Sequence, residues 1–322
     1  MSIRDFHHMK KKKLKKEFLL FFLSLFSVFI FLNALNLNLG ASKKIKIVTS
    51  IFPLMEFSRA VSGDRGEVSL LLPAGAEVHT WQARPSDIIR LSSADLFIYI
   101  GSGLEPWIQD ILKSVKSSNL NVLEASQGIS LIEGKPQNRE HGHEHGVADP
   151  HIWLDFGNDQ IIVDRIADVL SDIDPGGSKI YRKNAASYKE KLIRLDQKFM
   201  DSLKNCTHRK FIMGGHAAFG YLARRYNLRQ ISLLGLSPDS RPTPKKLIEV
   251  AELARRYKIE VIFFEASVSG KLAKVLAEEV GARTLVLNPG ANLTKEQLKS
   301  GTTFFDIMEK NLENFKDALI CR

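Results

Sequence analysis

The sequence predicts an α/β protein with two similar Rossmann-like lobes, each built on a parallel sheet, joined by one long, rigid α-helix. Three observations support this prediction. Short apolar segments alternate with helical stretches, the second half of the chain repeats the pattern of the first, and one long amphipathic segment lies between the halves. Nearly continuous apolar strands that alternate with helices are typical of a parallel sheet covered on both faces.

The strands and helices are predicted from runs of apolar residues and from the turn residues that bound them. In the first half we expect strands at 44–50, 67–73, 96–101 and 121–125, with helices at 53–62, 86–92 and 105–116. In the second half we expect strands at 210–214, 230–234, 260–265 and 283–287, with helices between them. Thr243-Pro244 is typical of a helix start, since Thr caps the first turn and Pro is favoured at its first position.

The segment 175–205 predicts the long helix. Its apolar residues recur at three- and four-residue spacing and form one stripe: Tyr181, Ala185, Tyr188, Leu192, Leu195, Phe199 and Leu203. Such a helix is about 40 Å long, comparable to the diameter of a domain. We expect it to join two lobes, and an ordinary surface helix is the alternative. The chain then divides into an N-terminal lobe at 43–156, a helical connection at 157–205 and a C-terminal lobe at 206–322.

Residues 1–42 predict a secretory signal peptide. A lysine-rich start precedes the apolar stretch 18–32, and Gly40-Ala41-Ser42 provides small residues for cleavage. As a helix this stretch spans about 22 Å, less than the roughly 30 Å hydrocarbon core of a membrane. Cleavage is therefore favoured over an uncleaved membrane anchor. We expect a protein that is periplasmic or otherwise extracytoplasmic.

The charges and the cysteines narrow the class of protein further. About half of the net charge of +10 lies in residues 1–17, and the remaining excess is spread along the helices. A charge spread in this way argues against nucleic acid binding. In an exported chain the two cysteines, Cys206 and Cys321, predict a disulfide that fixes the last helix to the second lobe, with two free thiols as the alternative.

Histidines point to a metal. His141, His143 and His145 lie in the polar segment 138–148, and a short His-rich tract of this kind is typical of loose metal binding, although it is also compatible with a merely polar loop. His79, His151 and His216 lie beyond the ends of predicted strands, where α/β sheets bind ligands. Three neutral imidazoles with one open position are a zinc arrangement.

Three motifs around these histidines resemble those of solute-binding proteins that feed zinc or manganese ABC importers. They are Glu77-Val78-His79, the run Asp-Pro-His-Ile-Trp-Leu-Asp at 149–155, and the run Gly-His-Ala-Ala-Phe-Gly-Tyr-Leu at 215–222. The resemblance covers roughly residues 44–319. It implies two lobes with a metal in the cleft between them, His79, His151 and His216 as ligands, and a membrane permease as partner of a monomeric binding protein.

The motifs leave the fourth ligand open. Many members of this family carry an acid after the last strand, where this chain has Asn288. Water or Glu77 is therefore a candidate for the fourth position. Glu265 either orients an imidazole through its second nitrogen or is a solvated acid at a strand end.

These observations predict a high-affinity extracytoplasmic protein that captures Zn²⁺ and delivers it to an ABC permease. Imidazole ligands suit zinc, whereas manganese prefers carboxylate and water oxygens. The His-rich segment is expected to collect or sense zinc without being required for the tight site. The alternatives are a manganese-binding protein of the same class, a metal-binding surface adhesin, and a zinc hydrolase, which the absence of an HExxH motif disfavours. We expect no enzymatic activity.

Overall fold

The computed structural model describes residues 43–115, 119–133, 148–238, 242–265 and 270–322. The predicted signal peptide and the histidines at 141, 143 and 145 lie outside these ranges. Within them, no helix has the length and apolar character needed to cross a membrane.

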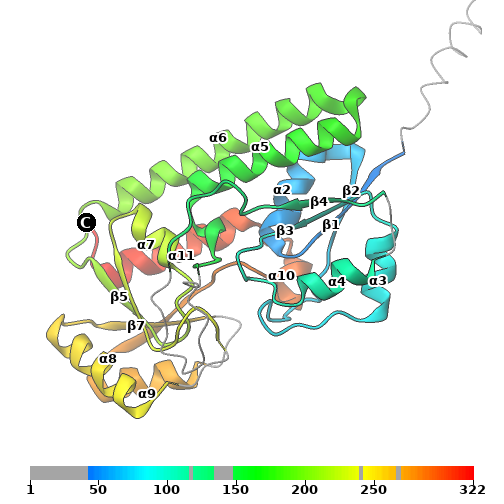
Figure 1. The fold of residues 1–322 in the computed structure, drawn as a ribbon. Coiled ribbons are helices and arrows are strands. Elements are labelled where there is room, and N and C mark those ends of the chain that lie inside the picture. The colour runs from blue at the N-terminus through cyan, green and yellow to red at the C-terminus, as the bar shows by residue number, and fades with distance from the viewer. Residues whose placement is uncertain (1–42, 116–118, 134–147, 239–241, 266–269) are drawn as a thin grey trace, which may run out of the picture. The chain divides into compact units, whose positions relative to one another are not determined.

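The first half of the described chain forms a four-stranded parallel sheet in the order β2-β1-β3-β4 (Figure 1). Its strands are β1 (Ile45–Thr49), β2 (Gly66–Leu70), β3 (Leu96–Tyr99) and β4 (Asn121–Glu124). Every residue of the central strand β3 is buried, as a continuous apolar run predicts. The helices of this half are α2 (Phe52–Ser62), α3 (Pro85–Ser92) and α4 (Ile108–Ser114).

The second half repeats this arrangement, with a parallel sheet in the order β6-β5-β7-β8. Its strands are β5 (Lys210–Met213), β6 (Arg229–Ser232), β7 (Val261–Glu265) and β8 (Arg283–Leu287). Its helices are α7 (Gly220–Arg225), α8 (Pro244–Arg256), α9 (Lys271–Val280), α10 (Lys295–Ser300) and α11 (Phe304–Leu319). All eight predicted strands are confirmed, and the shared strand order confirms that the lobes are similar.

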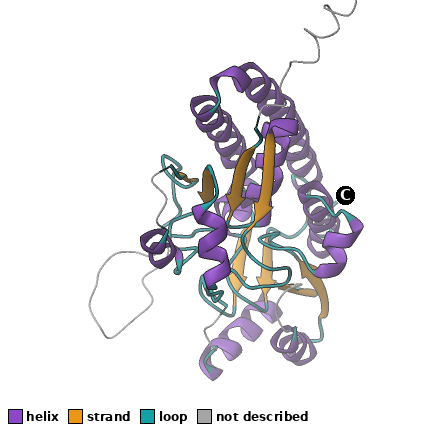
Figure 2. Cartoon of the chain, turned by 90° about the vertical axis from the view of Figure 1, so that its right-hand side faces the viewer, coloured by secondary structure: helices purple, strands orange, loops and turns teal. Residues whose placement is uncertain are grey.

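The helix between the halves, α6 (Ser178–Leu203), follows α5 (Phe156–Ile173) and packs against α5, α2 and α11 (Figures 1 and 2). All seven residues of the predicted stripe are buried. The helix has 26 residues, which gives a length of about 39 Å. It begins at Ser178 because Pro175–Gly177 forms a 3-10 turn, and glycine costs about 1 kcal/mol in a helix interior.

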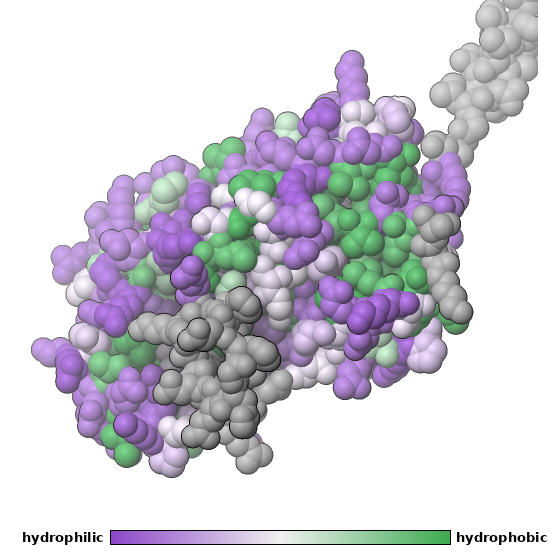
Figure 3. All heavy atoms as spheres, in the orientation of Figure 1, coloured by the Kyte–Doolittle hydropathy of each residue, from purple (hydrophilic) through white to green (hydrophobic). Residues whose placement is uncertain are grey.

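One continuous apolar core extends from the first sheet through α5 and α6 to α7 and α11. A second, smaller core lies between the second sheet and the helices α8 and α9. Because the larger core reaches elements of both halves and α6, it holds both lobes against the long helix. On the surface, Figure 3 shows hydrophilic residues along the upper edge, where α6 lies, and apolar residues gathered over the first sheet.

Two local features test the predicted details. The disulfide between Cys206 and Cys321 is present and fixes the end of α11 to the residues that follow α6, as predicted. The helix predicted at 105–116 is shorter, because α4 begins only at Ile108. Glu105 does not continue it backwards, since its carboxylate accepts hydrogen bonds from the backbone N–H groups of Ile100 (2.9 Å) and Gly101 (3.0 Å).

Candidate metal centre

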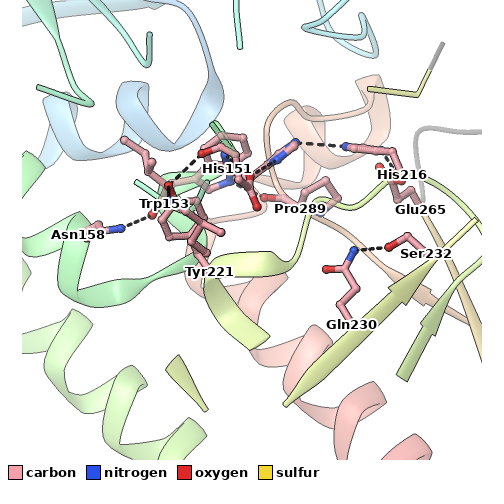
Figure 4. Close-up of polar contacts among 12 residues, drawn as sticks. His151, Trp153, Asn158, His216, Tyr221, Gln230, Ser232, Glu265 and Pro289 are labelled. Carbon is pink, nitrogen blue, oxygen red and sulfur yellow. Dashed lines mark hydrogen bonds and ion pairs between the residues drawn. The ribbon is translucent and has the colours of Figure 1, made fainter. Parts of the chain in front are cut away.

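Three histidines from distant parts of the chain converge at the carboxyl ends of the two sheets. His79 lies in the loop after β2, His151 precedes the 3-10 turn Ile152–Leu154, and His216 follows β5. Each offers one ring nitrogen, and these nitrogens lie within 4.8 Å of one another. The Nε2 atoms of His151 and His216 are 3.2 Å apart, so the two rings face each other across the site (Figure 4).

His151 is held by the aspartate two residues before it. The Asp149 Oδ1 atom lies 2.8 Å from His151 Nδ1 and accepts the backbone N–H of His151 at 3.0 Å. Both side chains are buried. This contact fixes the outer nitrogen of the ring and leaves Nε2 directed at the centre of the site.

Trp153 braces the same turn against the second lobe. Its indole Nε1 donates to the carbonyl of Pro289, in the loop after β8, at 2.7 Å. The indole is fully buried, and its ring centroid lies 5.4 Å from that of His151. The motif around His151 is therefore anchored in both lobes.

His216 is held by the last residue of β7. Its Nδ1 atom lies 2.6 Å from Glu265 Oε1, and both side chains are almost completely buried. A Cβ atom on Gly215 would lie 2.8 Å from the same carboxylate oxygen, so glycine is needed for this close approach. Burial lowers the pKa of His216, but the contact with Glu265 and the nearby carboxylates of Glu77 and Asp149 outweigh it, and the pKa is raised.

His79 has a different environment. Its ring is partly exposed, and burial together with the neighbouring His151 and His216 lowers its pKa to about 3. Its backbone N–H donates to Glu77 Oε1 at 3.3 Å. The ring is therefore neutral at physiological pH, with a lone pair available to a metal.

The site opens into a cavity of about 220 Å³ that is lined by all three histidines and by Glu77, Glu265 and Asn288. The Asn288 Oδ1 atom accepts the backbone N–H of Gly290 at 2.8 Å, which commits it to its own loop. Burial raises the pKa of Glu77. No Asp or Glu in the described ranges has an oxygen close enough to join the group of three ring nitrogens.

The structure thus brings together the three histidines that the sequence analysis singled out, and it places Glu265 behind one of them rather than in solvent. It places Asn288 at the cavity wall with its oxygen already occupied. Sequence reasoning missed Asp149 as the partner of His151, although its place two residues before the histidine was a usable signal. In metal sites a histidine almost always directs its second nitrogen to a carboxylate, carbonyl or water, which is the arrangement at His151 and His216.

Comparison with known proteins finds relatives that are named for zinc uptake and zinc binding. The family model for ZnuA, the periplasmic component A of zinc-uptake complexes, matches residues 47–318. The high-affinity zinc uptake system protein ZnuA of Bacillus subtilis is 38% identical over 285 residues, covering 87% of this chain and 89% of the relative. The zinc-binding protein AdcA of Streptococcus pyogenes serotype M18 is 35% identical over 319 residues. That match covers 94% of this chain but only 61% of AdcA, so the chain spans about three-fifths of the length of this relative.

Solved structures agree with these relatives. The Zn(II)-bound ZnuA-like domain of Streptococcus pneumoniae AdcA is 35% identical, with a TM-score of 0.73, and the match covers 86% of this chain and 99% of that domain. The laminin-binding protein Lmb of Streptococcus agalactiae, described as bifunctional with adhesin and metal transporting activity, is 29% identical with a TM-score of 0.75, over 85% of this chain and 99% of Lmb. The expected extracytoplasmic location agrees with the description of the family as periplasmic. From its sequence, its fold and its cluster of histidines, the chain belongs to the ZnuA family of periplasmic zinc-uptake components.

Proposed function

We propose that this protein captures Zn²⁺ between its lobes and delivers it to the membrane permease of an ABC importer, with His79, His151 and His216 as the metal ligands. The observation that carries the proposal is the convergence of three ring nitrogens within 4.8 Å, two of them on rings whose outer nitrogens contact buried carboxylates. Three neutral imidazoles with a fourth position left to another ligand form a tetrahedral zinc site.

Water or Glu77 completes the proposed coordination. Glu77 lines the cavity beside His79. We assign Glu265 an orienting role, because its oxygen contacts the outer nitrogen of His216 at 2.6 Å. Asn288 is a poor candidate, since its oxygen accepts the N–H of Gly290.

The proposed division into lobes follows the two sheets. We place the N-terminal lobe at 43–156, the helical connection at 157–205 and the C-terminal lobe at 206–322. His79 and His151 then belong to the first lobe and His216 to the second, so a bound zinc ion joins the lobes. The permease would recognise this joined state.

A chelator-competition titration of the purified protein with Zn²⁺ and Mn²⁺ tests the proposal. We expect tight zinc binding and weak manganese binding, since imidazole suits zinc and manganese prefers oxygen ligands. His216→Ala should abolish the tight site. His208→Ala is the matched control, because His208 lies just before β5, at the end of that strand opposite to His216. Tight manganese binding, or zinc binding that is unchanged in His216→Ala, would refute the ligand assignment.

The His-rich segment is proposed to be an accessory zinc collector. Deleting residues 140–146 should leave one tight zinc per chain and change only the weaker binding. Loss of the tight site in this deletion would contradict the accessory role.

A surface adhesin that retains the metal site is a second candidate, because Lmb is described as having both activities. Surface labelling of intact cells and binding to immobilised laminin distinguish the two. If cells need the protein for zinc-dependent growth and the protein does not bind laminin, the result supports the importer role alone.

A further inference from the structure

Residues 132–133 pair with residues 148–149. The backbone N–H of Asp149 donates to the carbonyl of Ile132 at 2.8 Å. Glu133 and Ala148 form an antiparallel bridge beside that bond. We call these four residues, Ile132, Glu133, Ala148 and Asp149, the neck.

One hydroxyl group from the second lobe holds both strands of the neck. The Tyr221 hydroxyl accepts the backbone N–H of Ile132 at 3.1 Å and donates to the carbonyl of Asp149 at 2.9 Å. Tyr221 is fully buried and lies in the first turn of α7 (Figure 4). Because the hydroxyl is both donor and acceptor, replacing it with hydrogen leaves a backbone group on each strand without this partner.

The neck is also part of the metal centre. Asp149, whose carbonyl accepts from Tyr221, holds His151 through its carboxylate at 2.8 Å. The other carboxylate oxygen lies against Gly220, where an added Cβ atom would approach it to 2.4 Å. His216 lies only five residues before Tyr221, ahead of the same helix. The first turn of α7 therefore follows His216 in the chain and contacts Asp149, the residue that orients His151.

We infer that Tyr221 is a positioning residue that fixes His151 relative to His216 by holding Asp149 and the neck to α7. The inference deepens the proposed function and rests on it, since it assigns Tyr221 a part in zinc affinity. It also ties the neck to the metal site, because Ile132 and Asp149 meet at the hydroxyl that positions His151.

The test compares Tyr221→Phe with Tyr226→Phe. Tyr226 lies at the end of α7, and its buried hydroxyl donates to Asp196 of the long helix at 2.7 Å rather than to the neck. Both variants lose one buried, hydrogen-bonded hydroxyl, so both are expected to unfold at a lower temperature. Only Tyr221→Phe should weaken zinc binding, by about tenfold, the lower end of the range for residues that orient metal ligands. Only Tyr221→Phe should change the visible absorption spectrum of the protein loaded with Co²⁺, which reports ligand geometry.

Hydrogen exchange of the metal-free protein tests the neck without zinc. The amide protons of Ile132 and Asp149 should exchange faster in Tyr221→Phe and at the wild-type rate in Tyr226→Phe. If Tyr221→Phe does not fold, the wild type is measured with and without zinc. Zinc held by His151 should slow the exchange of the Ile132 and Asp149 amide protons.

The outcomes separate this inference from the proposed function. If Tyr221→Phe keeps wild-type zinc affinity and the wild-type Co²⁺ spectrum while losing stability like Tyr226→Phe, the positioning role is refuted. The same holds if zinc leaves exchange at the neck unchanged. If the wild type itself binds zinc weakly while the neck amides respond to Tyr221→Phe as expected, the zinc-capture proposal fails and the contact between Tyr221 and the neck stands.

Discussion

The pair His151 and His216 differs from His79 in how each ring is held. The two rings of the pair are buried, and each has its outer nitrogen on a buried carboxylate, at 2.8 Å from Asp149 and 2.6 Å from Glu265. His79 is partly exposed, and the carboxylate next to it contacts its backbone N–H rather than its ring. The site therefore combines two pre-oriented imidazoles with a third that is neutral and positioned chiefly by its loop.

Electrostatics reinforce this difference. The contact with Glu265 raises the pKa of His216, whereas burial and the two neighbouring imidazoles lower the pKa of His79 to about 3. A carboxylate on the outer nitrogen makes an imidazole a stronger donor to a metal. We therefore expect the pair to contribute more to zinc affinity than His79.

Removing one of the proposed ligands should reduce zinc affinity the most. We expect His151→Ala to weaken zinc binding by more than about a hundredfold, above the range for residues that only orient ligands. His79→Ala should weaken zinc binding less, because water from the exposed side can take the place of the imidazole. Chelator-competition titrations of both variants measure the difference. Equal losses of zinc affinity in the two variants would show that the fixed orientation of His151 and His216 adds nothing to that affinity.

Removing the orienting carboxylates should have the next largest effect. Asp149→Asn and Glu265→Gln should each weaken zinc binding about ten- to a hundredfold, because the ring that each holds loses its fixed orientation and part of its basicity. Asp174→Asn is a matched control, since Asp174 also holds a partner, Arg65, through its carboxylate but lies between α5 and α6. Wild-type affinity in both site variants would show that packing alone orients the rings.

The sequence predicted the fold well because its signals are local. Each strand is a short apolar run bounded by turn residues, and the stripe of α6 is regular enough to be read along the chain. The sequence was a poor guide where tertiary contacts decide the start of a helix or the burial of a charged residue. The helix predicted at 105–116 begins late because Glu105 binds the loop before it. Buried Asp196 on α6 is explained by its ion pair with Arg225 of α7 and by the hydrogen bond from the Tyr226 hydroxyl, and no pattern along α6 reveals either contact.

The site was partly predictable for the same reason. The three histidines follow predicted strands, and parallel strands bring such positions to one edge of a sheet. The sequence left the role of Glu265 open between an orienting residue and a solvated acid, and its 1% exposure excludes the solvated alternative. Tyr221 had no signal of its own, since its partners Ile132 and Asp149 lie 89 and 72 residues away in the chain.

The pH dependence of zinc binding should reflect the different pKa values of His216 and His79. A proton on His216 must leave before zinc binds, and because the pKa of this residue is raised above 6.5, competition begins at a higher pH than for an ordinary histidine. His79, with a pKa of about 3, does not compete near neutral pH. Below the pKa of His216, zinc affinity should fall about tenfold per pH unit, as expected for the displacement of one proton. Titrations from pH 8 downwards measure the slope, and a hundredfold fall per unit would show that a second histidine is protonated as well.

The smallest expected effect concerns Glu77, the acid beside His79. Its carboxylate lines the cavity but is outside the group of three nitrogens, and burial raises its pKa, which disfavours the charged form that a metal needs. Glu77→Gln should therefore weaken zinc binding by no more than about threefold, which corresponds to less than about 0.7 kcal/mol. The Co²⁺ spectrum of this variant should match that of the wild type if water occupies the fourth position. A tenfold or greater loss together with a changed spectrum would instead make Glu77 the fourth ligand. The His79 side of the site would then be held by a carboxylate too, although by one that binds the metal rather than the ring.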